Sequence, residues 1–144
     1  MARVSNRTEF EGIDAFGVGE PNPWGAHFTG SSFLAGLTPE GYPLGVANVT
    51  FEPGCRNEWH IHHASAGGGQ LLICTAGEGW YQAWGEPARS LAAGDVVAIP
   101  ANVKHWHGAK ADSWFSHLAI EVPGEDASTE WCERVDDAAY DGME

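Results

Sequence analysis

Four of the seven histidines in this chain form two His-x-His pairs. One pair is His60 and His62, and the other is His105 and His107. Side chains on a β-strand alternate between its two faces, so both rings of each pair lie on the same face if the pairs are on strands. Neutral imidazole is the commonest protein ligand of metal ions, and an open metal site needs about three such ligands. The spacing therefore predicts a metal site built from two strands.

The available donors indicate which ions suit such a site. Imidazole and oxygen donors without a thiolate suit divalent Mn, Fe, Co, Ni or Zn. Cys55 and Cys74 do not occur in a ligand spacing, and we interpret them as packing residues. The three cysteines of the chain are odd in number and widely spaced, so they indicate no disulfide framework. We expect one divalent ion.

Two histidines, His107 from the second pair and His117 farther along the chain, have more than one interpretation. His107 is a fourth metal ligand, a hydrogen-bond donor in a substrate pocket, or an inner histidine with its own partners. His117 shares one strand face with Ala119 and Glu121, and small Ala119 between two polar side chains suits a cavity wall. His117 is then either an acid or base in catalysis or a hydrogen-bonded wall residue.

Composition indicates a single domain. The 144 residues, 43% of them hydrophobic, are enough for one compact domain with a real core. No apolar run approaches the roughly 18 to 20 residues that a membrane span needs. The first 14 residues are polar and charged, unlike a secretory signal peptide. We therefore expect a cytoplasmic protein whose thiols are reduced.

The chain is strongly acidic, with 7 Lys and Arg against 20 Asp and Glu and a formal net charge of −13. Such a chain repels nucleic-acid phosphate and anionic lipid. We therefore expect neither nucleic acid nor a membrane as a partner, and the small-molecule partner that we expect follows from the predicted metal site. The acidic residues are concentrated in residues 125–144, which we interpret as a solvated tail.

The segments between glycines and prolines predict an all-β sandwich or barrel with nine short strands. Turns are expected at 52–54, 76–79, 93–95 and 100–102, where Gly and Pro supply the backbone angles. Asp136 is positioned to cap a short helical turn that continues to Tyr140. The predicted strands are Ala26–Leu34, Val46–Phe51, Glu58–His62, Gln70–Thr75, Gly79–Trp84, Arg89–Leu91, Val96–Ile99, His105–Ala109 and Ser113–Val122.

Both histidine clusters resemble the two motifs of the cupin superfamily. In the first motif, a glycine, a His-x-His pair, an acidic residue and a second glycine correspond to Gly54, His60, His62, Gln70 and Gly77. In the second motif, a glycine, a proline and a histidine correspond to Gly94, Pro100 and His105. The resemblance implies a single-domain cupin, a jelly-roll-like double-stranded β-barrel, over residues 1–144. Its core would span about 28–123, followed by a short acidic tail at 124–144.

Within that superfamily the chain more closely resembles a bacterial subgroup of single-domain manganese cupins. These include the cupin-type hydroxynitrile lyases and the cupins associated with carboxymuconolactone decarboxylases. The similar segments are residues 49–54, 94–97, 104–109 and 116–120. The resemblance implies metal ligation by His60, His62, Gln70 and His105, with manganese the expected ion. It also implies pocket roles for His107 and His117, with His117 as general base, and a pocket lining that includes Ala47, Val49 and Glu121.

The sequence departs from the family pattern at three places. Gln70 stands where most cupins have glutamate, a substitution shared with the lyase-like group. The loop at 63–69 is longer than in the lyases. In the second motif, Asn102 and Ala109 replace a glycine and an asparagine. Apart from these three departures from the motifs, Glu121 is a changed pocket residue.

The resemblance implies metal-dependent cleavage of a carbon–carbon bond in a small hydroxy compound. His117 would take the hydroxyl proton, and His107 would stabilise the leaving cyanide. A metal-dependent oxygenase and a non-catalytic metal- or small-molecule-binding cupin are the alternatives. The apolar face of the strand that ends at Val122 also predicts a homodimer.

Overall fold

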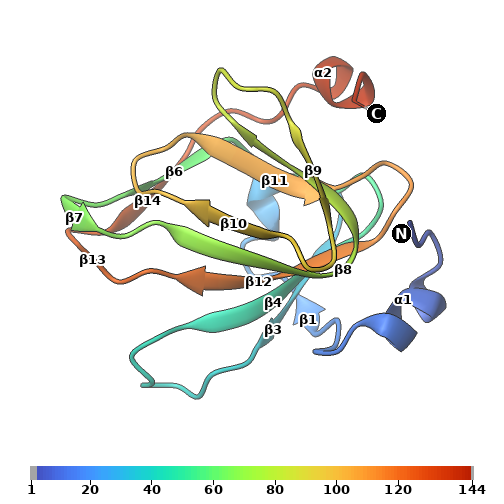
Figure 1. The fold of residues 1–144 in the computed structure, drawn as a ribbon, viewed down its shortest axis with the longest axis horizontal. Helices are drawn as coiled ribbons and strands as arrows, with labels where there is room; N and C mark the ends of the chain where they lie inside the picture. The colour runs from blue at the N-terminus through green and yellow to red at the C-terminus, as the bar shows by residue number, and fades with distance from the viewer. Residues whose placement is uncertain (1–2, 144) are drawn as a thin grey trace.

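The computed structural model describes residues 3–143, which fold into a curled antiparallel β-barrel with a helix near each end of the chain (Figure 1). The helical elements are α1 (Arg7–Ile13), a 3₁₀ turn (Gly25–His27) and α2 (Asp137–Asp141). The strands are β1 (Glu20–Pro21), β2 (Phe28–Thr29), β3 (Ser32–Gly36), β4 (Val46–Phe51), β5 (Arg56–Asn57), β6 (His60–His63), β7 (Ala66–Gly67), β8 (Gln70–Ala83), β9 (Arg89–Ala92), β10 (Val96–Ile99), β11 (His105–Ala109), β12 (Phe115–Glu121), β13 (Gly124–Glu125) and β14 (Ser128–Trp131). This confirms the all-β cupin-type fold that the sequence predicts.

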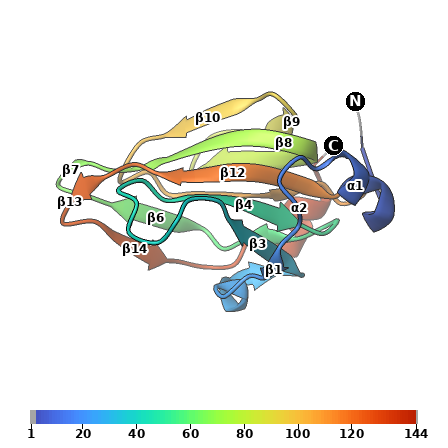
Figure 2. The ribbon, with the colours of Figure 1, turned by 90° about the horizontal axis from the view of Figure 1, so that it is seen from below.

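The barrel consists of two sheets that share β8. One sheet has the order β1-β3-β4-β12-β8-β10. In the other sheet, β11 pairs with β8, β5 and β6, and β14 extends the sheet beyond β6. Both helices lie at one end of the barrel, and the small β7–β13 pair lies at the opposite end (Figures 1 and 2). The strands thus enclose a space between two curved sheets.

The turn that the sequence predicts at 76–79 is wrong, because these residues lie inside β8. The chain does not reverse there, because β8 is one strand of 14 residues that passes from one sheet to the other. Gly77 has a φ of +74°, a conformation that L side chains rarely adopt, and the strand bends at this point. The partner strand β12 changes register between Ser116 and His117 beside the bend. A glycine that predicts a turn here produces a bend within a strand.

The predicted strand Ala26–Leu34 is also interrupted. Gly30 has a φ of +88°, and it separates β2 from β3, which belong to different sheets. The strands predicted at Val46–Phe51, Val96–Ile99 and His105–Ala109 have the predicted bounds. Gly30 therefore ends one short strand and lets the chain cross to the other sheet before the next strand begins.

Apolar side chains fill one half of the barrel interior. Phe51, Leu72, Leu91 and Phe115 have no exposed surface, and they come from four different strands. Outside the barrel, α1 buries Phe10 against Trp114, with ring centroids 5.7 Å apart. These contacts hold the two sheets together.

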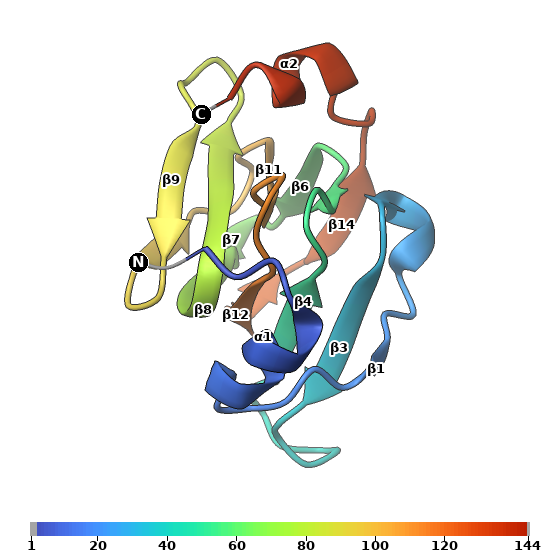
Figure 3. The same ribbon diagram turned by 90° about the vertical axis from the view of Figure 1, so that its right-hand side faces the viewer.

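The last segment of the chain packs against the barrel. β14 pairs with β6 in antiparallel register, Trp131 opposite His60. Asp136 caps α2 through the amide of Ala139, as predicted. Buried Tyr140 in α2 donates a hydrogen bond to the carbonyl of Ala109, at 2.6 Å. Figure 3 shows β14 beside β6 and α2 above the barrel. The sequence predicts the helical turn but not this strand.

In the part of the chain that the structure describes, no helix has the length and apolar character needed to cross a membrane.

Replacing Gly77 with alanine tests the bend in β8. An added Cβ would lie 1.8 Å from the carbonyl oxygen of Trp114, besides having to adopt a positive φ. Gly54 is the matched control, because its φ is +83° but nothing lies within 4 Å of an added Cβ. We expect Gly54→Ala to lower the free energy of unfolding by about 1 to 2 kcal/mol, the cost of the backbone conformation alone. We expect Gly77→Ala to lower it by at least twice as much or to prevent folding, as measured by urea unfolding. An equal loss of unfolding free energy in Gly54→Ala and Gly77→Ala would contradict the structure at this bend.

Candidate metal centre

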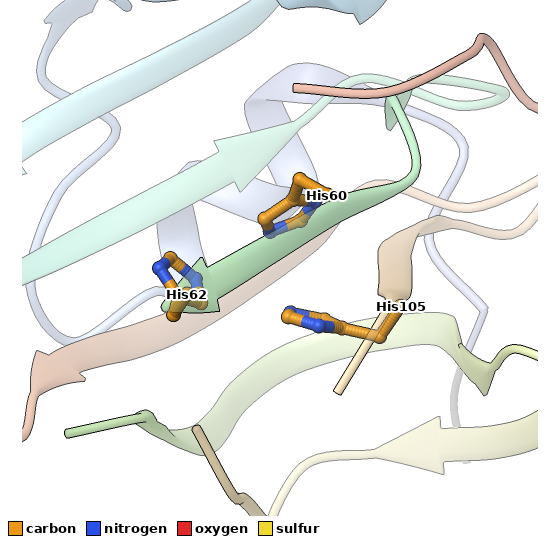
Figure 4. A group of neighbouring side chains, drawn as sticks. All are labelled: His60, His62 and His105. Carbon is orange, nitrogen blue, oxygen red and sulfur yellow. The ribbon is translucent and has the colours of Figure 1, made fainter. Parts of the chain in front are cut away.

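Three histidines converge inside the barrel (Figure 4). His60 and His62 extend from the same face of β6, and His105 extends from the start of β11, where it pairs with His60. One ring nitrogen from each lies within 4.8 Å of the others. Since nitrogens bound to one ion at about 2.1 Å are about 3.4 Å apart, small movements would bring all three to it. The predicted cluster of His60, His62 and His105 is therefore present, and it could hold a metal ion.

Backbone carbonyls orient two of these rings. The Nδ1 of His60 is 2.7 Å from the carbonyl oxygen of Glu58, and the Nδ1 of His105 is 2.9 Å from that of Val103. A carbonyl oxygen only accepts, so Nδ1 carries the proton in both rings and donates it. The Nε2 atoms then have a lone pair, which is the state a metal ligand requires.

The pattern of unpartnered polar atoms tests whether these residues suit a metal ion. Three buried polar atoms in this region have no hydrogen-bond partner: Nε2 of His62, Nε2 of His105 and Oε1 of Gln70. Leaving a buried acceptor unsatisfied costs about 1 to 3 kcal/mol. Three such atoms among neighbouring side chains fit a bound cation, and an amide oxygen fits it as well as imidazole does.

Burial keeps the histidines neutral. It lowers the pKa of His60 well below its usual value and that of His105 to about 4. Burial also lowers the pKa of His62, although the nearby charge of Glu121 and the Gln70 amide act in the opposite direction. Neutral imidazoles repel a cation less than charged ones and offer it their lone pairs.

A cavity of about 570 Å³ opens beside this cluster. This volume suits a small molecule. Its lining includes His60, His62 and Gln70, and also the predicted pocket residues Ala47, Val49, His107, His117 and Glu121. Ala119 lies there too, so the cavity face of β12 is the one that its alternation predicts.

His107 and His117 form a hydrogen-bonded pair inside the cavity wall. Nε2 of His117 lies 3.0 Å from Nδ1 of His107, and the side-chain amide of Asn57 lies 3.3 to 3.4 Å from the His107 ring nitrogens. The side-chain oxygen Oδ1 of Asn57 accepts a hydrogen bond from the backbone N–H of His107 at 2.9 Å. Burial lowers the pKa of His117 to about 4 and that of His107 well below its usual value. Both rings are neutral at pH 7 and touch the space that a ligand would occupy.

Several residues at the site escape the sequence analysis. Trp131 of β14 lines the cavity, and its ring lies 4.9 Å from that of His60. The Trp131 ring also stacks on the ring of His27, with the centroids 4.3 Å apart and an angle of 2° between the planes. Nδ1 of His27 lies 3.0 Å from Oε1 of Glu58. The only sequence signal for Trp131 is its alternation with Thr129, which also lines the cavity. An isolated four-residue alternation in an acidic segment is too weak to predict a strand.

His63 and the loop after it lie away from the cluster. His63 is part of β6, but its ring points outward and lies 2.7 Å from Glu130. The long loop leads into β7, whose Gly67 pairs with Gly124 of β13. The loop thus brings Gln70 to the start of β8 beside His62.

Comparison with known proteins agrees with this geometry. The family model described as "Cupin domain" matches residues 47–120. The chain is 40% identical over 131 residues to (R)-mandelonitrile lyase of Granulicella tundricola, which covers 90% of this chain and 94% of that enzyme.

Solved structures give the same result. The crystal structure of a cupin-like protein from Thermotoga maritima matches with a TM-score of 0.76 and 39% identity, covering 88% of this chain and 94% of that one. A DMSP lyase from Ruegeria pomeroyi matches with a TM-score of 0.58 over 74% of this chain and 54% of that one. At 22% identity this second likeness supports the fold alone.

Removing one histidine tests the metal centre. We expect wild-type protein, reconstituted with Mn²⁺ and desalted, to hold about one ion per chain in elemental analysis. His60→Ala removes one of three converging donors and is expected to abolish this content. His63→Ala, one strand position beyond His62 but facing solvent, should leave it unchanged. Equal metal content in His60→Ala and wild type would contradict the assignment.

The buried state of His117 predicts an acid sensitivity. Its pKa is about 4 in the folded chain and about 6.5 when unfolded, so the unfolded state binds more protons below pH 6.5. Stability contributed by neutral His117 is therefore present above pH 6.5 and is lost as the pH falls toward 4. Between pH 8 and pH 5 this amounts to about 2 kcal/mol. Urea unfolding of the metal-free proteins measures this. From pH 8 to pH 5, the free energy of unfolding of His117→Gln should fall by about 2 kcal/mol less than that of wild type. Parallel pH profiles would show that His117 is not the buried neutral group described.

Proposed function

The chain belongs to the cupin superfamily, and from that premise we propose that it is a metal-dependent lyase that cleaves α-hydroxynitriles into an aldehyde or ketone and hydrogen cyanide. The observation that supports this most strongly is the 40% identity to (R)-mandelonitrile lyase over 90% of the chain. The cavity beside the three histidines supports it further, since it places proton-accepting rings next to a candidate metal site.

In this proposal His60, His62, His105 and Gln70 hold one divalent ion, and manganese is the ion we propose. A bound divalent ion supplies a Lewis acid that favours the ionised form of a substrate hydroxyl. Three imidazoles and an amide are all neutral, so the protein ligands leave the charge of the ion uncompensated. Such a site favours oxygen or cyanide anions that form during the reaction.

His107 and His117 are the proposed proton-transfer pair. Nδ1 of His117 lies 3.3 Å from the carbonyl oxygen of Leu118, so Nδ1 carries the proton and donates it, and Nε2 of His117 accepts from Nδ1–H of His107. Nε2 of His107 then has the free lone pair. It takes the hydroxyl proton while the Nδ1 proton of His107 passes to Nε2 of His117, so the positive charge comes to rest on His117. The electrons of the O–H bond form the carbonyl, and the carbon–carbon bond breaks with its electron pair on the cyano carbon.

His107 has a second role in this scheme. After the transfer its Nε2 carries the former hydroxyl proton, and it can donate a hydrogen bond to the departing cyanide. This proton then completes hydrogen cyanide while His117 returns a proton to Nδ1 of His107, so the reaction is balanced without any further reactant. The low pKa values of both rings keep them neutral, and His117 can return its proton readily.

The remaining lining favours a neutral substrate with an apolar group. Phe28, Leu34, Val49 and Trp131 contribute apolar surface to the cavity, and Trp24 stands at it with 56% of its surface exposed. Among the described residues that line the cavity there is no lysine or arginine to hold a carboxylate or phosphate. An aryl or alkyl hydroxynitrile meets both conditions.

A cleavage assay with (R)-mandelonitrile tests the function. We expect the Mn²⁺-loaded protein to release benzaldehyde, followed by its ultraviolet absorbance at a pH low enough to suppress spontaneous cleavage. Removing a member of the proton-transfer pair should lower the rate by about 10² to 10⁴, so His117→Ala should lose at least a hundredfold in kcat while keeping its metal. His63→Ala should match wild type, because His63 faces solvent.

Absence of turnover by metal-loaded wild type on mandelonitrile and on aliphatic hydroxynitriles would contradict the proposal. Oxygen consumption with catechols or thiols would then favour the oxygenase. Thermal stabilisation by such compounds without turnover would indicate a binding module. The cytoplasmic location and the homodimer that the sequence predicts stay predictions.

A further inference from the structure

Glu121, the last residue of β12, lies directly opposite Gln70, the first residue of β8. Side chains of directly opposed residues share one face of a sheet, and here both line the cavity. The Nε2 group of Gln70 donates a hydrogen bond to Oε2 of Glu121. Glu121 is exposed at its outer side, whereas Gln70 is buried.

This contact determines which end of the amide faces the cluster. A carboxylate only accepts hydrogen bonds, so Gln70 must turn its NH₂ group toward Glu121. The Oε1 atom then points elsewhere, and it is buried without a hydrogen-bond partner, as are Nε2 of His62 and Nε2 of His105. In the flipped orientation the amide would present two N–H groups to a cation in place of an oxygen. The carboxylate therefore selects the amide orientation that can bind one.

Glu121 is not one of the side chains that converge as metal donors. His60, His62, His105 and Gln70 carry no negative charge when they bind an ion. Among the described residues that line the cavity, Glu121 is the only one with a carboxyl side chain. The donor group within 4.8 Å consists of the three histidines without a Glu121 oxygen, as far as the described residues go. Glu121 therefore lies behind the ligands rather than among them.

We propose that Glu121 is a positioning residue that sets the metal affinity of this site through Gln70. It holds the Gln70 oxygen toward the ion and polarises the amide, which makes that oxygen a better donor. The inference rests on the metal site described above and goes beyond it, because it assigns the orientation of one ligand to a residue that touches no ion.

Binding of Mn²⁺ alone, measured from the electron paramagnetic resonance signal of the free ion, tests this role. Loss of an outer hydrogen-bond partner usually weakens metal binding 10- to 100-fold. We expect Glu121→Leu to raise the Kd for Mn²⁺ by such a factor, since Gln70 then loses its acceptor. Glu121→Gln retains an acceptor oxygen without the charge, so its Kd should lie between those of wild type and Glu121→Leu. The unfolding midpoint of metal-free Glu121→Gln should match that of wild type, because this variant keeps an acceptor for Gln70 and position 121 is exposed at a strand end.

A double-mutant cycle separates an effect through Gln70 from a direct effect on the ion. In a Gln70→Ala background, Glu121→Leu should change the Kd less than twofold. The proposal is overturned if Glu121→Leu alone leaves the Kd within twofold of wild type, or if its full effect persists in the Gln70→Ala background. A wild type that binds no Mn²⁺ would overturn the metal site itself, whereas normal wild-type binding with an unaffected variant would overturn only the role of Glu121. Catalytic activity enters neither measurement.

Discussion

Burial of neutral imidazoles with unshared lone pairs is the constraint on which the rest of this structure depends. His60, His105, His107 and His117 are almost completely removed from solvent, and burial lowers the pKa of each. His107 and His117 satisfy one another, but Nε2 of His105 has no partner. A fold that has to bear such unsatisfied acceptors is less stable without an ion than with one. An ion bound by this cluster would therefore stabilise the fold as well as serve the proposed function.

The barrel provides the rigidity that this arrangement needs. His60 and His62 share a face of β6, His105 begins the neighbouring β11, and both strands are held by further strands on their other sides. Gly77 lets β8 bend from one sheet into the other, so Gln70 at one end of β8 belongs to the cavity while the other end pairs with β11. Sites on strands are held more precisely than sites on loops. The one proposed ligand that follows a long loop is Gln70, and Glu121 accepts a hydrogen bond from its amide.

Local sequence patterns predict a large part of this site. The period-2 geometry of strands predicts that His60 and His62 share one strand face and that His117 and Glu121 share another. The structure has both arrangements. The cupin resemblance predicts that the two histidine clusters lie close together in space. What the sequence does not predict comes from contacts between distant segments. The stack of His27 on Trp131 joins residues more than a hundred positions apart, and β14 forms because β6 offers it an edge. Gly77 illustrates a different limit, since a positive φ is compatible with a turn or a strand bend, and only the neighbouring strands decide between them.

Anomalous X-ray scattering from a crystal of the Mn²⁺-loaded protein would test the metal centre most directly. It locates the ion independently of activity and affinity. The account predicts a single strong peak at about 2.0 to 2.2 Å from one nitrogen each of His60, His62 and His105 and from Oε1 of Gln70. A peak bound through His107 in place of Gln70, or a peak remote from the three histidines, would contradict it.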